Sequence, residues 1–302
     1  MKVLITGIGG FIGAHVAMAA MSRGWEITGI VRETTNLRRL KSISGDLSLL
    51  RCDLDNLARV KNVLSGQWFD VCIHCAWFAT AGKYLNALEN ITSLNSCLRL
   101  VETLAIQGCK RFIGVGSCFE YDASFGYLSE DTPTAPSSLY GATKSAAQTS
   151  LASLVALLGM KATWARLFLQ YGPEEDDTRL VPSVIRSLLK GEPVKTTAGE
   201  QIRDFLHVYD VAAALLEVAT NDLSGIVNIG SGQPVTVRHV VEMIALQLGR
   251  PDLPQFGALD YRAGDPMFIC ANNARLRSQT AWKPQFTLSN GLAQTIDWWR
   301  KQ

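Results

Sequence analysis

The amino-acid sequence predicts an α/β fold: a doubly wound parallel sheet with helices on both faces, followed by a smaller α+β part. Short runs rich in Val and Ile alternate with segments of helical period through the first half of the chain. A cluster of glycines directly follows the first run, and the alternation breaks down in the second half. Consecutive strands joined by helices run parallel, and strands covered on both faces are apolar throughout.

The alternating pattern extends from the amino terminus to about residue 168. It predicts strands over residues 2–5, 26–31, 49–53, 70–76, 111–117 and 161–168, and helices over 11–23, 56–64, 84–107 and 138–158. The second half predicts helices over 180–190, 208–219, 237–248 and 288–301, a strand over 226–229 and loops from 249 to 266. We therefore expect a first domain of residues 1–168, to which about 204–230 return, and a second domain of 169–203 and 231–302.

Composition and charge are those of a globular protein. Of the 302 residues, 47% are hydrophobic and 19% are charged, and the formal net charge is +2. This balance argues against a nucleic-acid-binding or membrane-surface protein, because either would need a basic patch. The first apolar run, residues 2–5, leads directly into glycines, unlike the longer apolar core of a secretory signal peptide. We expect a cytoplasmic protein with neither nucleic acid nor membrane as a partner.

Seven cysteines are scattered along the chain, an odd number that suits a reducing compartment. Cys72 and Cys75 have the spacing of a metal or redox pair, but they lie within the strand predicted over residues 70–76. Side chains alternate between the two faces of a strand, so these two thiols would point in opposite directions. We interpret them as core residues and expect no metal site.

The glycines after the first predicted strand form a dinucleotide-binding turn of the Rossmann type. Gly7, Gly10 and Gly13 are spaced three residues apart, between the first strand and the first helix. Glycine lets the backbone turn tightly and approach a pyrophosphate, which then lies at the helix N-terminus. The second strand follows about twenty residues later, as this motif requires.

The end of the second predicted strand distinguishes between the two nicotinamide dinucleotides. An acidic side chain there binds the ribose 2′-hydroxyl of NAD, whereas an arginine pairs with the 2′-phosphate of NADP. Arg32 follows this strand, with Arg38 and Arg39 nearby. Arg32 therefore favours NADP(H) over NAD(H), while the adjacent Glu33 keeps NAD open.

A tyrosine and a lysine occur at the start of the helix predicted over residues 138–158. Tyr140 and Lys144 are four residues apart and therefore share one helix face. A free tyrosine has a pKa of about 10, and a nearby ammonium stabilises its phenolate, which eases proton exchange near neutral pH. The preceding strand ends at Ser117. We predict that Tyr140 and Lys144 carry proton-transfer chemistry beside the dinucleotide.

Several segments resemble the extended branch of the short-chain dehydrogenase/reductase superfamily. The first is TGIGGFIG, residues 6–13, which is similar to the glycine turn of that branch. Residues 129–133, 166–173, 203–211 and 262–266 resemble its SEDTP, RxxNxYGP, RDFxHVxDV and RxGDP segments, so the likeness spans nearly the whole chain.

This resemblance implies a role for each catalytic candidate. Tyr140 would be the general acid/base, Lys144 would also bind the nicotinamide ribose, and Ser117 would hydrogen-bond the reacting oxygen. The cofactor would contact Gly7, Gly10, Phe11, Ile12, Gly13, Arg32, Asp53, Leu54, Cys75, Ala76, Trp77, Tyr140 and Lys144.

The same resemblance points to nucleotide-sugar epimerases, dehydratases and ketoreductases. It implies a nucleotide-diphosphate sugar as the substrate, held at its diphosphate by Arg203 and Arg262 and contacted by Ser117 and Cys118. A doubly charged diphosphate needs charge-assisted donors of this kind. The related helices pair into a four-helix dimer interface, so residues 84–107 and 138–158 predict a homodimer.

Three departures from the family pattern refine the prediction. Sugar 4,6-dehydratases have an Asp-Glu pair where this chain has Cys118 and Phe119, which argues against dehydration. Leu169 replaces the asparagine of NxYGP and weakens the expected contact with the diphosphate. Trp77 stands where most relatives have a small residue, and it either shapes the nicotinamide pocket or packs in the core.

Our first hypothesis is NADPH-dependent reduction of the C4 keto group of an NDP-4-keto-6-deoxysugar, with Tyr140 as the proton donor. The alternative is an NAD-dependent NDP-sugar 4-epimerase, which recycles its cofactor without net redox change. A third hypothesis is that the protein is not an enzyme: it would be a catalytically silent protein that senses NADP or acts as a scaffold.

Overall fold

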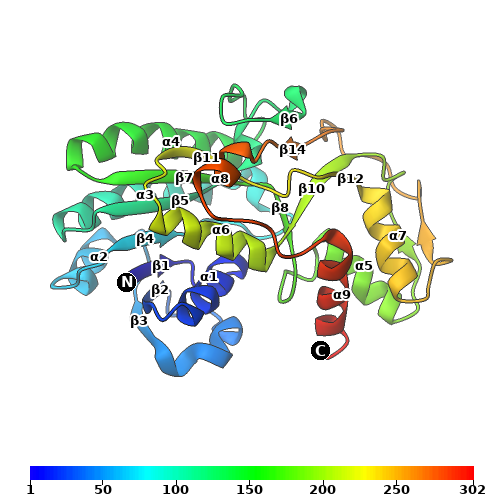
Figure 1. The fold of residues 1–302 in the computed structure, drawn as a ribbon, viewed down its shortest axis with the longest axis horizontal. Coiled ribbons are helices and arrows are strands. Elements are labelled where there is room, and N and C mark those ends of the chain that lie inside the picture. The colour runs from blue at the N-terminus through cyan, green and yellow to red at the C-terminus, as the bar shows by residue number, and fades with distance from the viewer.

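The computed structural model describes residues 1–302, and its largest feature is a seven-stranded parallel sheet in the order β11-β7-β5-β4-β1-β2-β3. Figure 1 shows helices on both faces of this sheet and a smaller lobe beside it. The sheet strands are β1 (Lys2–Thr6), β2 (Glu26–Val31), β3 (Leu47–Arg51), β4 (Val71–His74), β5 (Arg111–Ser117), β7 (Lys161–Leu167) and β11 (Gly225–Ile229). The predicted doubly wound α/β fold is confirmed.

Two apolar cores cover the two faces of this sheet. One face packs against α1 (Phe11–Ser22) and α6 (Val208–Thr220), and the other against α2 (Leu57–Leu64), α3 (Glu89–Ile106) and α4 (Leu139–Leu158). Cys72 belongs to the second core and Cys75 packs against the first, so the two thiols lie on opposite faces as predicted. All seven cysteines are free.

The smaller lobe, at the right of Figure 1, has its own apolar core between α5 (Leu180–Leu189), α7 (Val237–Gln247) and α9 (Leu288–Trp299). Its three-stranded sheet has the order β12-β10-β8. The strands are β8 (Leu169–Tyr171), β10 (Ile202–His207) and β12 (Pro234–Thr236). The chain therefore leaves the large sheet after β7, and α6 and β11 bring it back.

The remaining elements are short. Two-residue strands pair as β13 (Pro254–Gln255) with β9 (Val194–Lys195), and as β14 (Cys270–Ala271) with β6 (Tyr127–Leu128). The short helices are η1 (Arg38–Asp46), η2 (Tyr84–Asn86), η3 (Cys118–Glu120), η4 (Ala123–Phe125) and α8 (Ala274–Gln279). None of the helices combines the length and the hydropathy that crossing a bilayer requires.

The helix predicted over residues 84–107 is wrong at its start. The structure has the short turn η2 first, and α3 begins only at Glu89. Buried Asn90 explains the break, because its Nδ2 donates to the carbonyl oxygens of Tyr84 (2.7 Å) and Ala87 (2.8 Å). An asparagine side chain that binds nearby carbonyls competes in this way with a continuous helix.

Strand β5 contains two glycines because a tryptophan of β7 crosses it. A Cβ on Gly114 would lie 2.3 Å from the Trp164 ring, and a Cβ on Gly116 would lie 2.3 Å from its Nε1. Trp164 is itself buried. This close packing positions the end of β5, where Ser117 stands.

We predict that Gly114→Ala lowers the free energy of unfolding by about 1–3 kcal/mol, because the added methyl group overpacks this contact. Urea unfolding would measure the change. Gly45→Ala is the control, since a Cβ there meets nothing within 4 Å. Equal stability of the two variants would contradict this account of the β5–β7 packing.

Candidate active site

One cavity of about 1080 Å³ lies between the carboxyl ends of the large sheet and the smaller lobe. In open α/β sheets, ligands bind in this crevice. All of the residues predicted from the sequence to form the site line it: Gly7, Gly10, Phe11, Ile12, Gly13, Arg32, Asp53, Leu54, Cys75, Ala76, Trp77, Ser117, Cys118, Tyr140, Lys144, Arg203 and Arg262. Their individual roles stay predictions.

The glycine turn packs backbone against backbone. Gly7 has a φ of +66°, and a Cβ there would lie 2.7 Å from the backbone nitrogen of Ala76. A Cβ on Gly13 would lie 2.2 Å from the carbonyl oxygen of Gly7. Side chains at these positions would therefore separate β1, α1 and the end of β4. The bare backbone at the start of α1 fits the close approach of a dinucleotide pyrophosphate.

At the end of β2, Arg32 is exposed and lines the cavity, and its backbone nitrogen donates to Thr35 Oγ1 (2.9 Å). Glu33 is not among the lining residues, and its carboxylate lies 3.6 Å from Arg51. Of these two neighbours, only Arg32 lines the cavity.

Arg39 connects the glycine turn to the smaller lobe. Its Nε donates to the carbonyl oxygen of Glu174 (3.0 Å), and its Nη1 donates to that of Gly9 (3.4 Å). Glu174 has a φ of +65°, which is unusual for a residue with a side chain. This bridge brings the loop after β8 over the cavity.

The catalytic candidates lie at the start of α4, where Ser138 caps the helix by accepting from the backbone nitrogen of Gly141 (3.2 Å). Lys144 is buried, and its Nζ donates to the carbonyl oxygen of Val115 (2.5 Å). Burial lowers the pKa of Lys144 to about 8. The ammonium lies 5.8 Å from the centre of the Tyr140 ring.

Tyr84 and Ser117 flank the phenol of Tyr140. Burial raises the pKa of Tyr140, neighbouring Tyr84 acts in the same direction, and a hydrogen bond with the Ser117 side chain lowers it. The ring of Tyr84 meets that of Tyr140 edge to face, with centres 4.9 Å apart. In the protein alone, Tyr140 therefore holds its proton next to the Ser117 hydroxyl.

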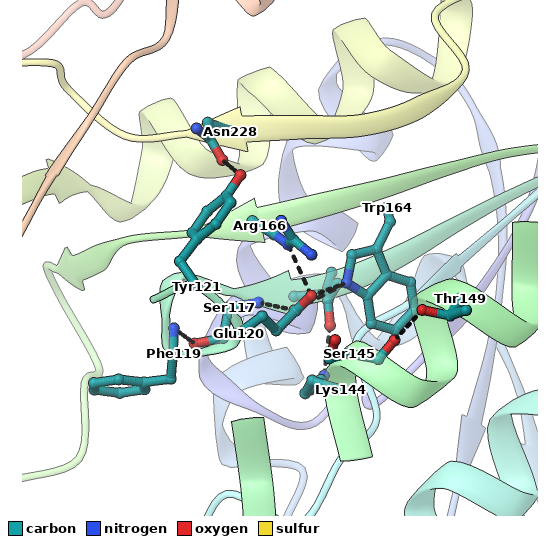
Figure 2. A network of polar contacts seen from close by, with 11 residues as sticks. Ser117, Phe119, Glu120, Tyr121, Lys144, Ser145, Thr149, Trp164, Arg166 and Asn228 are labelled. Carbon is teal, nitrogen blue, oxygen red and sulfur yellow. Dashed lines mark hydrogen bonds and ion pairs between the residues drawn. The ribbon is translucent and has the colours of Figure 1, made fainter. Parts of the chain in front are cut away.

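Ser117 is held by a capping box across η3, seen in Figure 2. Its backbone nitrogen donates to Glu120 Oε1 (2.7 Å), and its Oγ accepts from the backbone nitrogen of Phe119 (3.2 Å). The hydroxyl proton of Ser117 is not used in this box. It can be donated to an oxygen in the cavity.

The carboxylate of Glu120 is the centre of the network in Figure 2. It is fully buried and accepts from Arg166 Nε (2.8 Å) and Trp164 Nε1 (2.9 Å), in addition to Ser117. The Arg166 guanidinium lies 4.2 Å from the centre of the Tyr121 ring. Glu120 therefore faces the core of the sheet and is not among the residues that line the cavity.

Sequence reasoning missed the Glu120–Arg166 pair. A serine followed three residues later by a glutamate is the signature of a capping box, and it was visible in the sequence. The partner arginine comes from β7, 46 residues later, and only the β5–β7 pairing brings the two side chains together.

At the far end of the cavity, Arg203 is buried beside Asp265, with Nη2 donating to Oδ1 (2.8 Å). Arg262 lies in the exposed loop before Asp265. Both arginines line the cavity, so the structure brings the predicted diphosphate pair to the same site. Asp265 offsets one of the two charges, and an incoming anion would compete with it.

Among the further residues that line the cavity are Tyr84, Glu175 and Arg179, none of which was predicted as a site residue. The Arg179 guanidinium lies 5.1 Å from the centre of the Tyr84 ring. Glu175 is buried, its Oε2 has no hydrogen-bond partner, and burial raises its pKa well above the ordinary range. No local pattern marks these positions, because they meet only when the loop after β8 folds over η2.

A family model described as the NAD dependent epimerase/dehydratase family matches residues 3–230. The chain belongs to this family. The predicted likeness to extended short-chain dehydrogenases/reductases, nucleotide-sugar enzymes that use NAD(P), is confirmed.

Relatives in sequence and in structure support this placement. A UDP-glucose 4-epimerase from Corynebacterium glutamicum is 28% identical, over 95% of this chain and 92% of that protein. A dTDP-glucose 4,6-dehydratase from Xanthomonas campestris pv. campestris is 27% identical, over 98% of this chain and 92% of that protein. Among solved structures, Thermus thermophilus UDP-glucose 4-epimerase in complex with NAD is 25% identical, covers 99% of both chains and has a TM-score of 0.88.

We predict that Glu120→Gln lowers the free energy of unfolding by about 3 kcal/mol, because it leaves the buried Arg166 charge without its counter-ion. Asp222→Asn is the control, since its ion pair with Lys161 is exposed and screened by water, and the variant is expected to keep the wild-type stability. Thermal or urea unfolding would measure both. A Glu120 variant as stable as the control would contradict the structural role of the pair.

Proposed function

We propose that this family member is an NAD(P)-dependent 4-epimerase of a nucleotide-diphosphate sugar. One observation carries the proposal: Ser117, Tyr140 and Lys144 face one cavity with the glycine turn, whereas the one carboxylate of η3, Glu120, is turned into the core. The site thus holds the groups that move a proton at a hydroxyl oxygen. The loop after β5 lacks the acid that elimination of water would need.

The proposed reaction oxidises the sugar C4 hydroxyl to a ketone and reduces it again from the opposite face. Bound NAD(P) would supply the acceptor and donor of the hydride at carbon 4. Tyr140, as the phenolate, removes the hydroxyl proton and later returns it, while Ser117 donates a hydrogen bond to the same oxygen. The Lys144 ammonium stabilises the phenolate and thereby counteracts the burial that raises the Tyr140 pKa.

The other end of the cavity suits a diphosphate. Arg203 and Arg262 offer charge-assisted donors there, and Arg179 is a further cation of the cavity lining. The substrate class is therefore a nucleotide-diphosphate sugar. The named relatives make UDP-glucose, UDP-glucuronate and UDP-arabinose the first candidates to test.

A second candidate function is NADPH-dependent reduction of a nucleotide 4-keto-6-deoxysugar. One observation favours it: Arg32 lines the cavity at the position that selects the cofactor, and Glu33 does not. The 4-epimerases among the relatives and the NAD in the Thermus thermophilus complex favour the first proposal. We therefore place epimerisation ahead of the reduction that the sequence pattern favoured.

The decisive assay presents a panel of UDP- and dTDP-sugars with NAD or NADPH. An epimerase interconverts two sugars with no net change in reduced cofactor. A reductase consumes one NADPH for each 4-keto sugar, and that result would overturn the first proposal in favour of the second. Tight cofactor binding without turnover of any sugar would contradict both and favour a silent cofactor-binding protein.

We predict that Tyr140→Phe lowers kcat by roughly 10²- to 10⁴-fold, because the variant has no acid/base group at the sugar oxygen. Tyr127→Phe is the matched control, since Tyr127 is exposed and lies outside the cavity. Single-turnover kinetics at saturating substrate would measure the change. Wild-type turnover by Tyr140→Phe would refute the proposed mechanism.

We further propose a homodimer formed through α3 and α4, which pack side by side on one face of the sheet. Each carries apolar side chains on its outer surface, with Ile91 46% and Leu157 84% exposed. Multi-angle light scattering is expected to give twice the chain mass, and Leu157→Glu is expected to reduce it. A monomer at micromolar concentration would contradict the proposal.

A further inference from the structure

Trp77 follows β4 and lies against the lysine of the site. The Nζ of Lys144 is 3.9 Å from the centre of the Trp77 ring, which is within the range of a cation–π interaction. The only hydrogen bond of this ammonium inside the protein goes to the carbonyl oxygen of Val115. Lys144 forms no salt bridge, and its nearest acceptor is the Val115 carbonyl oxygen. Of the three aromatic rings that face the ammonium, the Trp77 ring is the nearest, with those of Trp164 and Tyr140 at 5.7 Å and 5.8 Å.

The ring of Trp77 is fixed in place by the break before α3. Its Nε1 donates to Asn90 Oδ1 (2.9 Å), and Asn90 is fully buried. The amide nitrogen of Asn90 binds the carbonyl oxygen of Tyr84, whose ring meets that of Tyr140 edge to face. The contacts thus form a closed ring of residues: Lys144, Trp77, Asn90, Tyr84 and Tyr140.

We propose that Trp77 is a positioning residue for the reaction: its indole face holds the Lys144 ammonium charged and directed into the cavity. Asn90 orients the indole. The inference rests on the proposed roles of Tyr140 and Lys144. It goes beyond them, because it attributes the stabilisation of the charged lysine to an aromatic ring.

The other titratable groups around Lys144 do not obscure a change in its pKa. Glu120 acts on Lys144 through space from η3, and His74, Cys75 and Cys97 face it from β4, the end of β4 and α3. Burial lowers the pKa of His74 to about 3 and raises those of the two thiols to about 12. These three groups therefore do not titrate between pH 6 and pH 10, where burial places Lys144.

The sign of the expected change follows from the charge that the indole stabilises. Without the ring, the ammonium is less favoured, and the pKa of Lys144 falls further in the direction in which burial already lowers it. At neutral pH a smaller fraction of Lys144 then stabilises the phenolate. The acid limb of kcat/KM for sugar oxidation, which reports the Tyr140–Lys144 pair, therefore moves to higher pH.

The experiment measures two pH profiles for the wild type, Trp77→Leu and Trp77→Phe. The first is the dissociation constant of NADH in the Tyr140→Phe background, where Lys144 is the group expected to titrate. The second is kcat/KM with the sugar that the panel identifies. Lys144→Met has no ammonium at this position, so the pH dependence that disappears in this variant is the part of the binding profile caused by Lys144.

We expect Trp77→Leu to move the basic limb of NADH binding down by roughly one pH unit and the acid limb of kcat/KM up by a similar amount. Trp77→Phe keeps an aromatic face and is expected to restore most of both shifts. Trp282→Leu is the control for lost packing, because Trp282 is buried outside the cavity. It is expected to lower Tm and to leave both profiles unchanged.

A Trp77→Leu protein that loses stability as Trp282→Leu does, but keeps the wild-type limbs in both profiles, would overturn the proposal and leave Trp77 a packing residue. Failure of the proposed function has a different signature. In that case no sugar turns over, but the NADH-binding profiles still compare the tryptophan variants. If Trp77→Leu does not fold, Asn90→Ala removes the orienting hydrogen bond, and its profiles decide the question.

Discussion

The site depends on one buried ion pair, Glu120 with Arg166. Charges taken out of water are costly, and this pair is tolerable because Trp164 and the Ser117 backbone satisfy further lone pairs of the carboxylate. The pair connects β5, β7 and η3, and it fixes Ser117 where the strand ends. It also turns the carboxylate of Glu120, the only one in η3, away from the cavity, so η3 offers no acid to a bound substrate.

A second constraint is the close packing of backbone against backbone at the glycine turn, where no side chain comes between the segments. Gly7 and Gly13 let β1, α1 and the end of β4 approach one another, so that residues 75–77 lie beside the dinucleotide turn. The same segment carries Trp77 to Lys144. The turn therefore places its bare backbone and the start of α4 on one cavity, although α4 begins more than a hundred residues later.

The sequence was most informative where the chemistry is local. The glycine spacing is set by the tight backbone turn and the step from Tyr140 to Lys144 by helix geometry, and both were predicted with the doubly wound fold. Contacts between distant segments were not: Arg166 reaches Glu120 only through strand pairing, and Arg179 reaches Tyr84 only through a folded loop. The start of α3 was misplaced because one side chain, Asn90, competes with the helix. Arg32 favours NADP(H), whereas the NAD in the Thermus thermophilus complex favours NAD(H).

The most direct test of the central claim follows the hydrogen at carbon 4. The protein would be given a nucleotide sugar carrying deuterium at that carbon, together with unlabelled cofactor, and the product would be examined by mass spectrometry. A 4-epimerase removes this hydride and returns it within one site, so the account predicts that the product keeps the deuterium at carbon 4. Product that has lost the label to free cofactor, or that gains its hydrogen from added NADPH, would contradict it.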